Sequence, residues 1–124
     1  MLEKQREYYT IEEYFAHEES TEFRSEYYQG EIYVLAGGSA NHNRIALNIA
    51  SFLDNEFESQ RCEVFIGDVR LLIQQVELYT YPDVVVVCGD LNFVPGRTDT
   101  ITNPTVILEI LSPSTENYDR GKKF

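Results

Sequence analysis

Two short runs of β-branched apolar residues constrain the fold of this chain most strongly. They are PDVVVVC, residues 82–88, and PTVILEILS, residues 104–112. Each has the pattern of a strand that is covered on both faces, and such strands lie in the centre of a sheet. The sequence therefore predicts two central strands. Each of them carries one carboxylate, Asp83 in the first and Glu109 in the second.

Short-range patterns predict the other elements. Thr10 and Glu13 have the spacing of a capping box, which predicts a short helix after Thr10. Gln29 and Gly30 separate two alternating runs, and the glycine supplies the positive φ of a hairpin turn. From residue 39 to about residue 60 the apolar spacing is helical, which predicts the main packing helix. Three further patterns predict strands in residues 62–69 and 70–79 and the start of a helix at Glu116.

Length and composition point to one domain and exclude several classes of protein. A chain of 124 residues supports one modest core, so we expect a single domain over residues 1–124 that ends part-way through a helix. No run approaches the roughly 18 apolar residues of a membrane span, and no signal peptide is visible. A soluble, cytoplasmic protein is expected. Cys62 and Cys88 lie in no paired motif and are expected to be packing thiols rather than a disulfide or a metal site.

The formal net charge of −11 limits the partners of the chain. A protein that binds nucleic acid mainly through phosphates normally presents a basic face, and this chain repels polyanions overall. The acidic residues are dispersed rather than gathered in a tail. Part of them can form a solvated surface, and part can form a site that a cation neutralises.

The carboxylates of the two central strands are the candidates for such a site. Because side chains alternate along a strand, Glu109 shares a face with Ile107, and Asp83 shares a face with Val85. Two buried carboxylates need compensation, which a divalent cation supplies, and Mg²⁺ prefers oxygen ligands. The alternative is that each acid pairs with an arginine, for which the chain offers Arg70, Arg97 and Arg120.

Several segments resemble a known family. HNRIALNIASFL, YPDVVVVC and NPTVILEILSPSTENYDRGKKF are similar to the Uma-two family of restriction-endonuclease-like proteins, in the PD-(D/E)xK nuclease superfamily. Pro82-Asp83 and Glu109 match the first two elements of the superfamily motif, and EILSPSTENYDRGKK is the most specific segment. The resemblance implies an α/β (α+β) fold with a mixed central sheet flanked by helices. An N-terminal helix and β-hairpin would precede this sheet, and a last strand would follow Phe124.

The resemblance also implies a site and an activity. Asp83, Glu109 and the main-chain carbonyl of Ile110 would hold one Mg²⁺ or Mn²⁺ for hydrolysis of DNA phosphodiester bonds. The superfamily pattern has a lysine two residues after the second acid, but this chain has Leu111 there. The lysine would instead come from the DRGKK segment, with Lys123 the best match and Lys122 the near alternative. A nuclease that cuts both strands would be expected to act as a homodimer.

Two further residues match the family, and two other functions stay open. His42, in the first turn of the predicted helix, could lie in the site or be a packed, hydrogen-bonded residue. Glu26, on the hairpin, could supply a further acid. A nuclease-fold binding or scaffold module without activity would fit the acidic charge and Leu111. A glycosidase with Asp83 and Glu109 as its acid pair would lack a sugar-stacking tryptophan, because the chain contains none.

Overall fold

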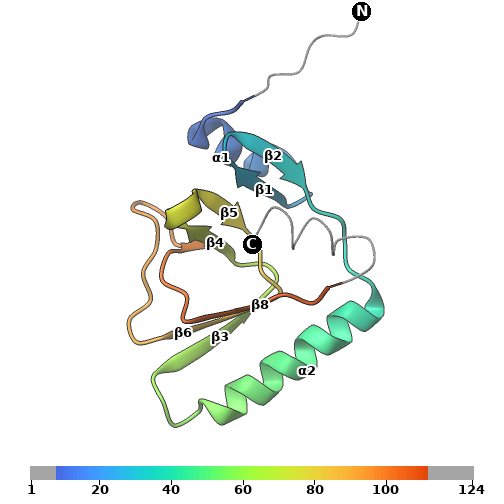
Figure 1. Ribbon diagram of the computed structural model, residues 1–124, viewed down its shortest axis with the longest axis vertical. Helices are drawn as coiled ribbons and strands as arrows, with labels where there is room; N and C mark the ends of the chain where they lie inside the picture. The colour runs from blue at the N-terminus through green and yellow to red at the C-terminus, as the bar shows by residue number, and fades with distance from the viewer. Residues whose placement is uncertain (1–7, 112–124) are drawn as a thin grey trace, which may run out of the picture.

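The computed structural model of the protein describes residues 8–111. Two α-helices, a 3₁₀ turn and eight strands form this part of the chain (Figure 1). In chain order they are α1 (Ile11–Ser20), β1 (Ser25–Tyr28), β2 (Glu31–Val34), α2 (Ala40–Glu56), β3 (Cys62–Ile66), β4 (Arg70–Ile73), η1 (Gln74–Val76), β5 (Leu78–Thr80), β6 (Val84–Cys88), β7 (Thr100–Ile101) and β8 (Val106–Leu108). The helix predicted from Glu116 lies outside the described residues.

The strands are divided between two sheets. One has five strands in the order β2-β1-β5-β4-β7, and the other has three strands in the order β3-β6-β8. β4 and β7 are parallel, whereas the other neighbours are antiparallel. The predicted mixed α+β class is therefore confirmed. The division into two sheets was not predicted, because the apolar pattern of a strand shows that it is covered but does not identify its neighbours.

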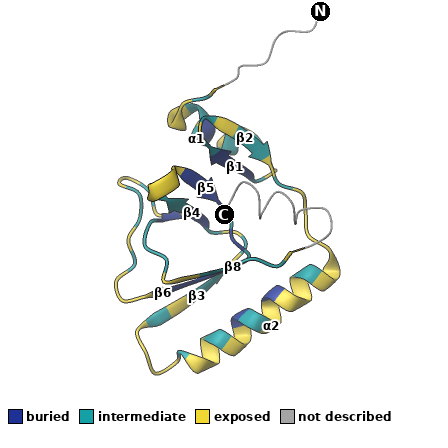
Figure 2. Ribbon diagram, in the orientation of Figure 1, coloured by how far each residue is buried: buried dark blue, intermediate teal, exposed yellow. Residues whose placement is uncertain are grey.

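β6 is the central strand of the smaller sheet, and its two faces meet different partners. Val85 and Val87 pack with Leu71 and Ile101 of the five-stranded sheet. Val84, on the opposite face, packs against α2. All four valines of β6 are at most 2% exposed, which gives the dark blue ribbon of Figure 2. The prediction that residues 82–88 contain a central strand covered on both faces is confirmed.

The prediction for residues 104–112 is wrong in one respect. β8 covers only Val106–Leu108, and among the described strands it lies at the edge of its sheet rather than in the centre. Its pairing with β6 ends early because the main-chain N–H of Ile110 donates a hydrogen bond to the side chain of Asp83 at 2.7 Å. The carboxylate of Asp83 thus accepts from a main-chain N–H that would pair with β6 if the β-ladder were longer.

The predicted helix starts and the hairpin are confirmed. Thr10 and Glu13 form a capping box at α1. In the hairpin, Gln29 and Gly30 both have positive φ, 50° and 83°, which is the backbone of a type I′ turn. α2 begins after Ser39, and Figure 1 shows it lying along the smaller sheet. Its buried stripe contains Ala46 and Ala50, with Ile49 and Leu53 partly buried beside them.

The expectation for the cysteines is wrong, because Cys62 and Cys88 form a disulfide. The two residues lie 26 positions apart, in no sequence motif that would indicate a bond. Antiparallel pairing of β3 with β6 places them directly opposite each other, with their Cα atoms 3.9 Å apart. The disulfide thus joins the end of the central strand to its neighbour.

No helix within residues 8–111 has both the length and the apolar character needed to cross a membrane.

Candidate active site

Asp83 immediately precedes β6 and Glu109 immediately follows β8, so both acids adjoin the same end of the smaller sheet. The ladder between β6 and β8 pairs Val84 with Leu108, and the same register, continued by one residue, pairs Asp83 with Glu109. Directly opposite residues of an antiparallel pair have their side chains on one face, with Cβ atoms about 4.5–5.5 Å apart. The 2.7 Å bond from Ile110 N to Asp83 Oδ2 agrees with this register. Two acids that are 26 residues apart in the sequence thus adjoin the same end of one strand pair.

This face is the one that β6 turns toward the five-stranded sheet. Ile107, two residues before Glu109, packs in the cluster that contains Val85 and Leu71. Leu108 and Ile110 pack on the other face, in the cluster beneath α2. Glu109 therefore points away from the helix, as the alternation along the sequence predicts.

Asp83 has a second partner on α2. His42 Nε2 lies 3.1 Å from Asp83 Oδ1, while the N–H of Ile110 reaches Oδ2. The side chains of His42 and Asp83 are 25% and 18% exposed. The structure thus brings His42 to the first predicted acid, while its role in a site stays a prediction.

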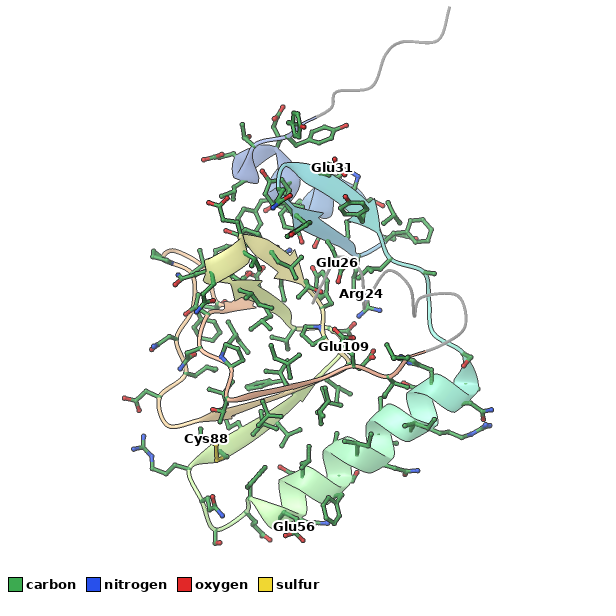
Figure 3. The ribbon with its side chains drawn as sticks, viewed as in Figure 1. Arg24, Glu26, Glu31, Glu56, Cys88 and Glu109 are labelled. Atoms are coloured by element: carbon green, nitrogen blue, oxygen red, sulfur yellow. A yellow bond between two sulfur atoms is a disulfide. The ribbon has the colours of Figure 1, made fainter. Side chains whose placement is uncertain are left out.

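Glu26 lies on the neighbouring sheet. It is a fully buried residue of β1, and the hydroxyl of Thr80 donates a hydrogen bond to its Oε2. Thr80 ends β5, and only Tyr81 and Pro82 separate it from Asp83. Figure 3 shows Glu26 on the side of β1 that is turned toward Glu109. Glu26 is therefore positioned beside the chain segment that carries Asp83, in an environment that contains a hydroxyl donor.

The donor set tests whether a metal fits. Among residues 8–111, no three His, Cys, Asp or Glu side chains converge closely enough to hold a metal ion by themselves. Asp83 and Glu109 nevertheless adjoin the same end of the β6–β8 pair, and the main-chain N–H of Ile110 lies against the carboxylate of Asp83. Mg²⁺ is commonly bound by one or two carboxylates together with waters and substrate phosphate oxygens. The chemistry of these donors therefore fits a hard divalent cation that retains several waters.

The structure also bears on the alternative of arginine pairing. Arg70 Nη2 lies 3.1 Å from Glu18 Oε1, and Arg97 makes two hydrogen bonds to Asp99, at 2.9 and 3.0 Å. In the described part of the chain, Asp83 makes no ion pair with an arginine. Arg120 lies outside that part, as do Lys122 and Lys123, so the predicted lysine stays a prediction.

A buried polar cluster that sequence analysis did not identify fixes the segment before Asp83. The side chain of Glu18, from α1, accepts hydrogen bonds from Arg70 and from the hydroxyl of Tyr81. Its other oxygen accepts from the N–H of Ser25 at 2.9 Å. Tyr14 completes the cluster by donating to the carbonyl of Ser25 at 2.7 Å. Scattered over four segments, these residues share no spacing that would have indicated a cluster.

The pKa values of the two tyrosines follow from this environment. Burial, together with the hydrogen bond to the Glu18 carboxylate, raises the pKa of Tyr81 to about 12. Burial and the nearby charge of Glu18 also raise the pKa of Tyr14. Both hydroxyls therefore stay protonated and act as donors over the ordinary pH range.

The Tyr81→Phe variant is expected to lose less stability at alkaline pH than the wild type does. The pKa of Tyr81 is raised from 10.0 to about 12 by folding. Its contribution is therefore complete below the unfolded-state pKa and is lost as the pH rises through the folded-state pKa. In urea titrations, the difference in free energy of unfolding between wild type and Tyr81→Phe should be constant at neutral pH and shrink between pH 10 and pH 12. A constant difference across that interval would contradict the account.

Residues 11–124 match the model of the Uma2 family, which is described as "Putative restriction endonuclease". The chain belongs to this family. The resemblance predicted from its sequence segments is therefore confirmed.

Relatives of this Uma2 chain occur in Synechocystis sp. One uncharacterized protein, sll1609, is 41% identical over 93% of the chain and 65% of its own length. Another, slr1290, is 40% identical over 91% of the chain and 58% of its own length. The chain thus spans about three fifths of the length of these relatives.

A solved structure shows the same fold. A protein of Anabaena variabilis, described as a putative nuclease belonging to DUF820, superposes with a TM-score of 0.65 over 83% of the Uma2 chain and 59% of its own chain. Its sequence identity is 21%, so this likeness concerns the fold. The expected restriction-endonuclease-like architecture agrees with a neighbour of this description.

Proposed function

We propose that this Uma2 chain is the core of a metal-dependent endonuclease that hydrolyses phosphodiester bonds in DNA. The observation that carries the proposal is the 2.7 Å hydrogen bond between Ile110 N and Asp83 Oδ2, which holds the two strand ends together. Asp83 and Glu109 would be the carboxylate ligands of one Mg²⁺ or Mn²⁺, and the carbonyl of Ile110 would be a third. Membership of the family supports the nuclease function.

The residues of the chain would divide the chemistry as follows. A divalent cation polarises a phosphate oxygen and makes a bound water more acidic. Asp83 and Glu109 would hold the ion at the end of the β6–β8 pair and would balance its charge. Lys123, taken from the resemblance, would stabilise the negative charge that develops when water adds to phosphorus. The bond from phosphorus to the leaving sugar oxygen then breaks, and that oxygen takes a proton.

The acidic charge of the protein is compatible with this substrate only near the metal. The formal net charge of −11 weakens long-range attraction to DNA. A bound divalent ion would cancel the charges of the two carboxylates and could coordinate a phosphate oxygen directly, so phosphate could be accepted at the site itself. We therefore propose that binding of DNA depends on the metal. Action as a homodimer and a cytoplasmic location stay predictions, and the Cys62–Cys88 disulfide is a bond that persists mainly in oxidising compartments.

The function is tested by cleavage of supercoiled plasmid by the full natural protein. We expect nicked or linear product with Mg²⁺ or Mn²⁺, no product with excess EDTA, and recovery when metal is restored. Asp90→Asn is a matched control because Asp90 is an exposed acid paired with Arg61, beyond the opposite end of β6. Undiminished cleavage in EDTA would contradict metal dependence, and cleavage of RNA alone would contradict the proposed substrate.

The second candidate is a binding or scaffold module with a nuclease fold and no activity. It is favoured by Leu111, which occupies the position of the superfamily lysine. Metal-dependent binding of labelled duplex DNA without any cleavage, at the same protein concentrations, would support this candidate over the enzyme.

A further inference from the structure

Both carboxylate oxygens of Asp83 are held by groups from different elements. Oδ2 accepts from the main-chain N–H of Ile110 at 2.7 Å, and Oδ1 lies 3.1 Å from His42 Nε2. The N–H of Ile110 is a fixed donor that follows β8, whereas the imidazole comes from the first turn of α2. A carboxylate that is held at both oxygens has one preferred orientation, because rotation about either side-chain torsion breaks the hydrogen bond from Ile110 or the contact with His42.

The residues at the start of α2 position the imidazole of His42. Ser39 caps the helix, and its side chain accepts from the main-chain N–H of His42 at 3.1 Å. Gly38 runs so close to the ring that a Cβ added there would lie 2.9 Å from His42 Nδ1. Glycine is thus the residue that lets the imidazole occupy this position. One edge of the ring faces the main chain of Gly38, and the other edge faces Asp83.

We propose that His42 is a positioning residue that orients Asp83 for metal binding. The imidazole would support Oδ1 through its Nε2 and leave the other coordination positions of the carboxylate available to a cation. Outer hydrogen-bond partners of this kind orient ligating carboxylates, and their removal costs about 10–100-fold in metal affinity or activity. The metal-binding role of Asp83 rests on the proposed function, whereas the orientation of its side chain does not.

The orientation of Asp83 is tested without metal by hydrogen exchange at the Ile110 amide. In His42→Ala, the carboxylate loses one of its two supports, so Ile110 N–H should exchange about tenfold faster, the effect of losing roughly 1.4 kcal/mol of hydrogen bonding. His42→Gln keeps an N–H donor at a similar reach and should exchange close to the wild-type rate. Asn43→Ala, in the same exposed turn, is the control. Exchange in His42→Ala at the wild-type rate would overturn the inference.

The consequence for metal binding is tested by titration of the full chain with Mn²⁺, followed by electron paramagnetic resonance. His42→Ala should bind Mn²⁺ about 10–100-fold more weakly, and His42→Gln should restore most of the affinity. Gly38→Ala, which displaces the ring without removing it, should also weaken binding. Equal weakening in His42→Gln and His42→Ala would mean that the imidazole itself binds metal, which would overturn the positioning role. If wild type binds no Mn²⁺, the proposed function fails, while the exchange measurement still decides whether His42 orients Asp83.

Discussion

Replacement of Asp83 by asparagine is expected to lower the rate of plasmid cleavage about 10³-fold, because a metal ligand supplies several kcal/mol of transition-state stabilisation and about 4 kcal/mol corresponds to that factor. Asparagine keeps an oxygen that can accept from Ile110 N–H, the 2.7 Å partner of Asp83 Oδ2. It loses the negative charge that attracts a cation. The variant should therefore fold normally and fail in cleavage, as measured by initial rates with saturating Mg²⁺.

The control for this prediction is the exposed acid Asp90, which lies after β6 and pairs with Arg61 at 2.7 Å. Asp90→Asn removes the same charge and should cleave at the wild-type rate. Glu109→Gln should resemble Asp83→Asn. If Asp83→Asn has a wild-type melting temperature and cleaves within a few-fold of wild type, Asp83 is not a metal ligand.

Replacement of Arg70 by methionine is expected to lower the free energy of unfolding by about 3–5 kcal/mol, because it leaves a buried carboxylate without its cation. The side chains of Arg70 and Glu18 are 7% and 5% exposed, and their atoms Nη2 and Oε1 lie 3.1 Å apart. Methionine retains most of the volume, so the effect reports the lost charge and hydrogen bonds rather than a cavity. Urea unfolding at neutral pH measures it.

Arg61→Met provides the matched comparison for this prediction. The pair of Arg61 and Asp90 is even closer, at 2.7 Å, but both side chains are at least 80% exposed. Exposed pairs contribute only about 0–1 kcal/mol, so this variant should be nearly as stable as wild type. Combining Arg70→Met with Glu18→Gln should restore part of the lost stability. Equal effects of the two arginine substitutions would contradict the structural importance of the buried cluster.

The sequence predicts those parts of the fold that local physics determines. The capping box at Thr10, the positive φ values at Gln29 and Gly30 and the apolar stripe of α2 all follow from residues within a few positions of each other. The continuous valines of β6 also predict burial on both faces correctly. The alternation along each strand places Asp83 with Val85 and Glu109 with Ile107, and the structure shows that these two faces coincide.

The features that sequence analysis missed depend on which segments become neighbours. The antiparallel register of β3 with β6 places Cys62 directly opposite Cys88, where the two form a disulfide. No residue near either cysteine in the sequence indicates its partner. In the same way, Glu18 meets Arg70 and Tyr81 only because α1 packs against the five-stranded sheet. β8 ends early because a side chain, that of Asp83, takes the donor of Ile110. The periodicity of apolar residues shows which face of an element is buried, whereas these contacts depend on which elements pack against each other.

The candidate site was likewise predicted in part: its residues follow from the sequence, but their main-chain contacts do not. Asp83, Glu109 and His42 were selected from the sequence, and the structure brings His42 to Asp83 and places the two acids next to the same end of one strand pair. The sequence did not indicate that the N–H of Ile110 donates to Asp83, because the type of a residue does not show where its main-chain N–H will donate. It is this hydrogen bond that joins the two strand ends.

Anomalous diffraction from crystals of the full protein soaked with Mn²⁺ tests the central claim most directly. The claim is that Asp83 and Glu109 bind one divalent cation together. It predicts a single strong anomalous peak with a carboxylate oxygen of each residue within about 2.0–2.5 Å, and its disappearance in Glu109→Gln. A structure in which Mn²⁺ is absent from the space between the two carboxylates, or is bound by one of them only, would contradict the claim.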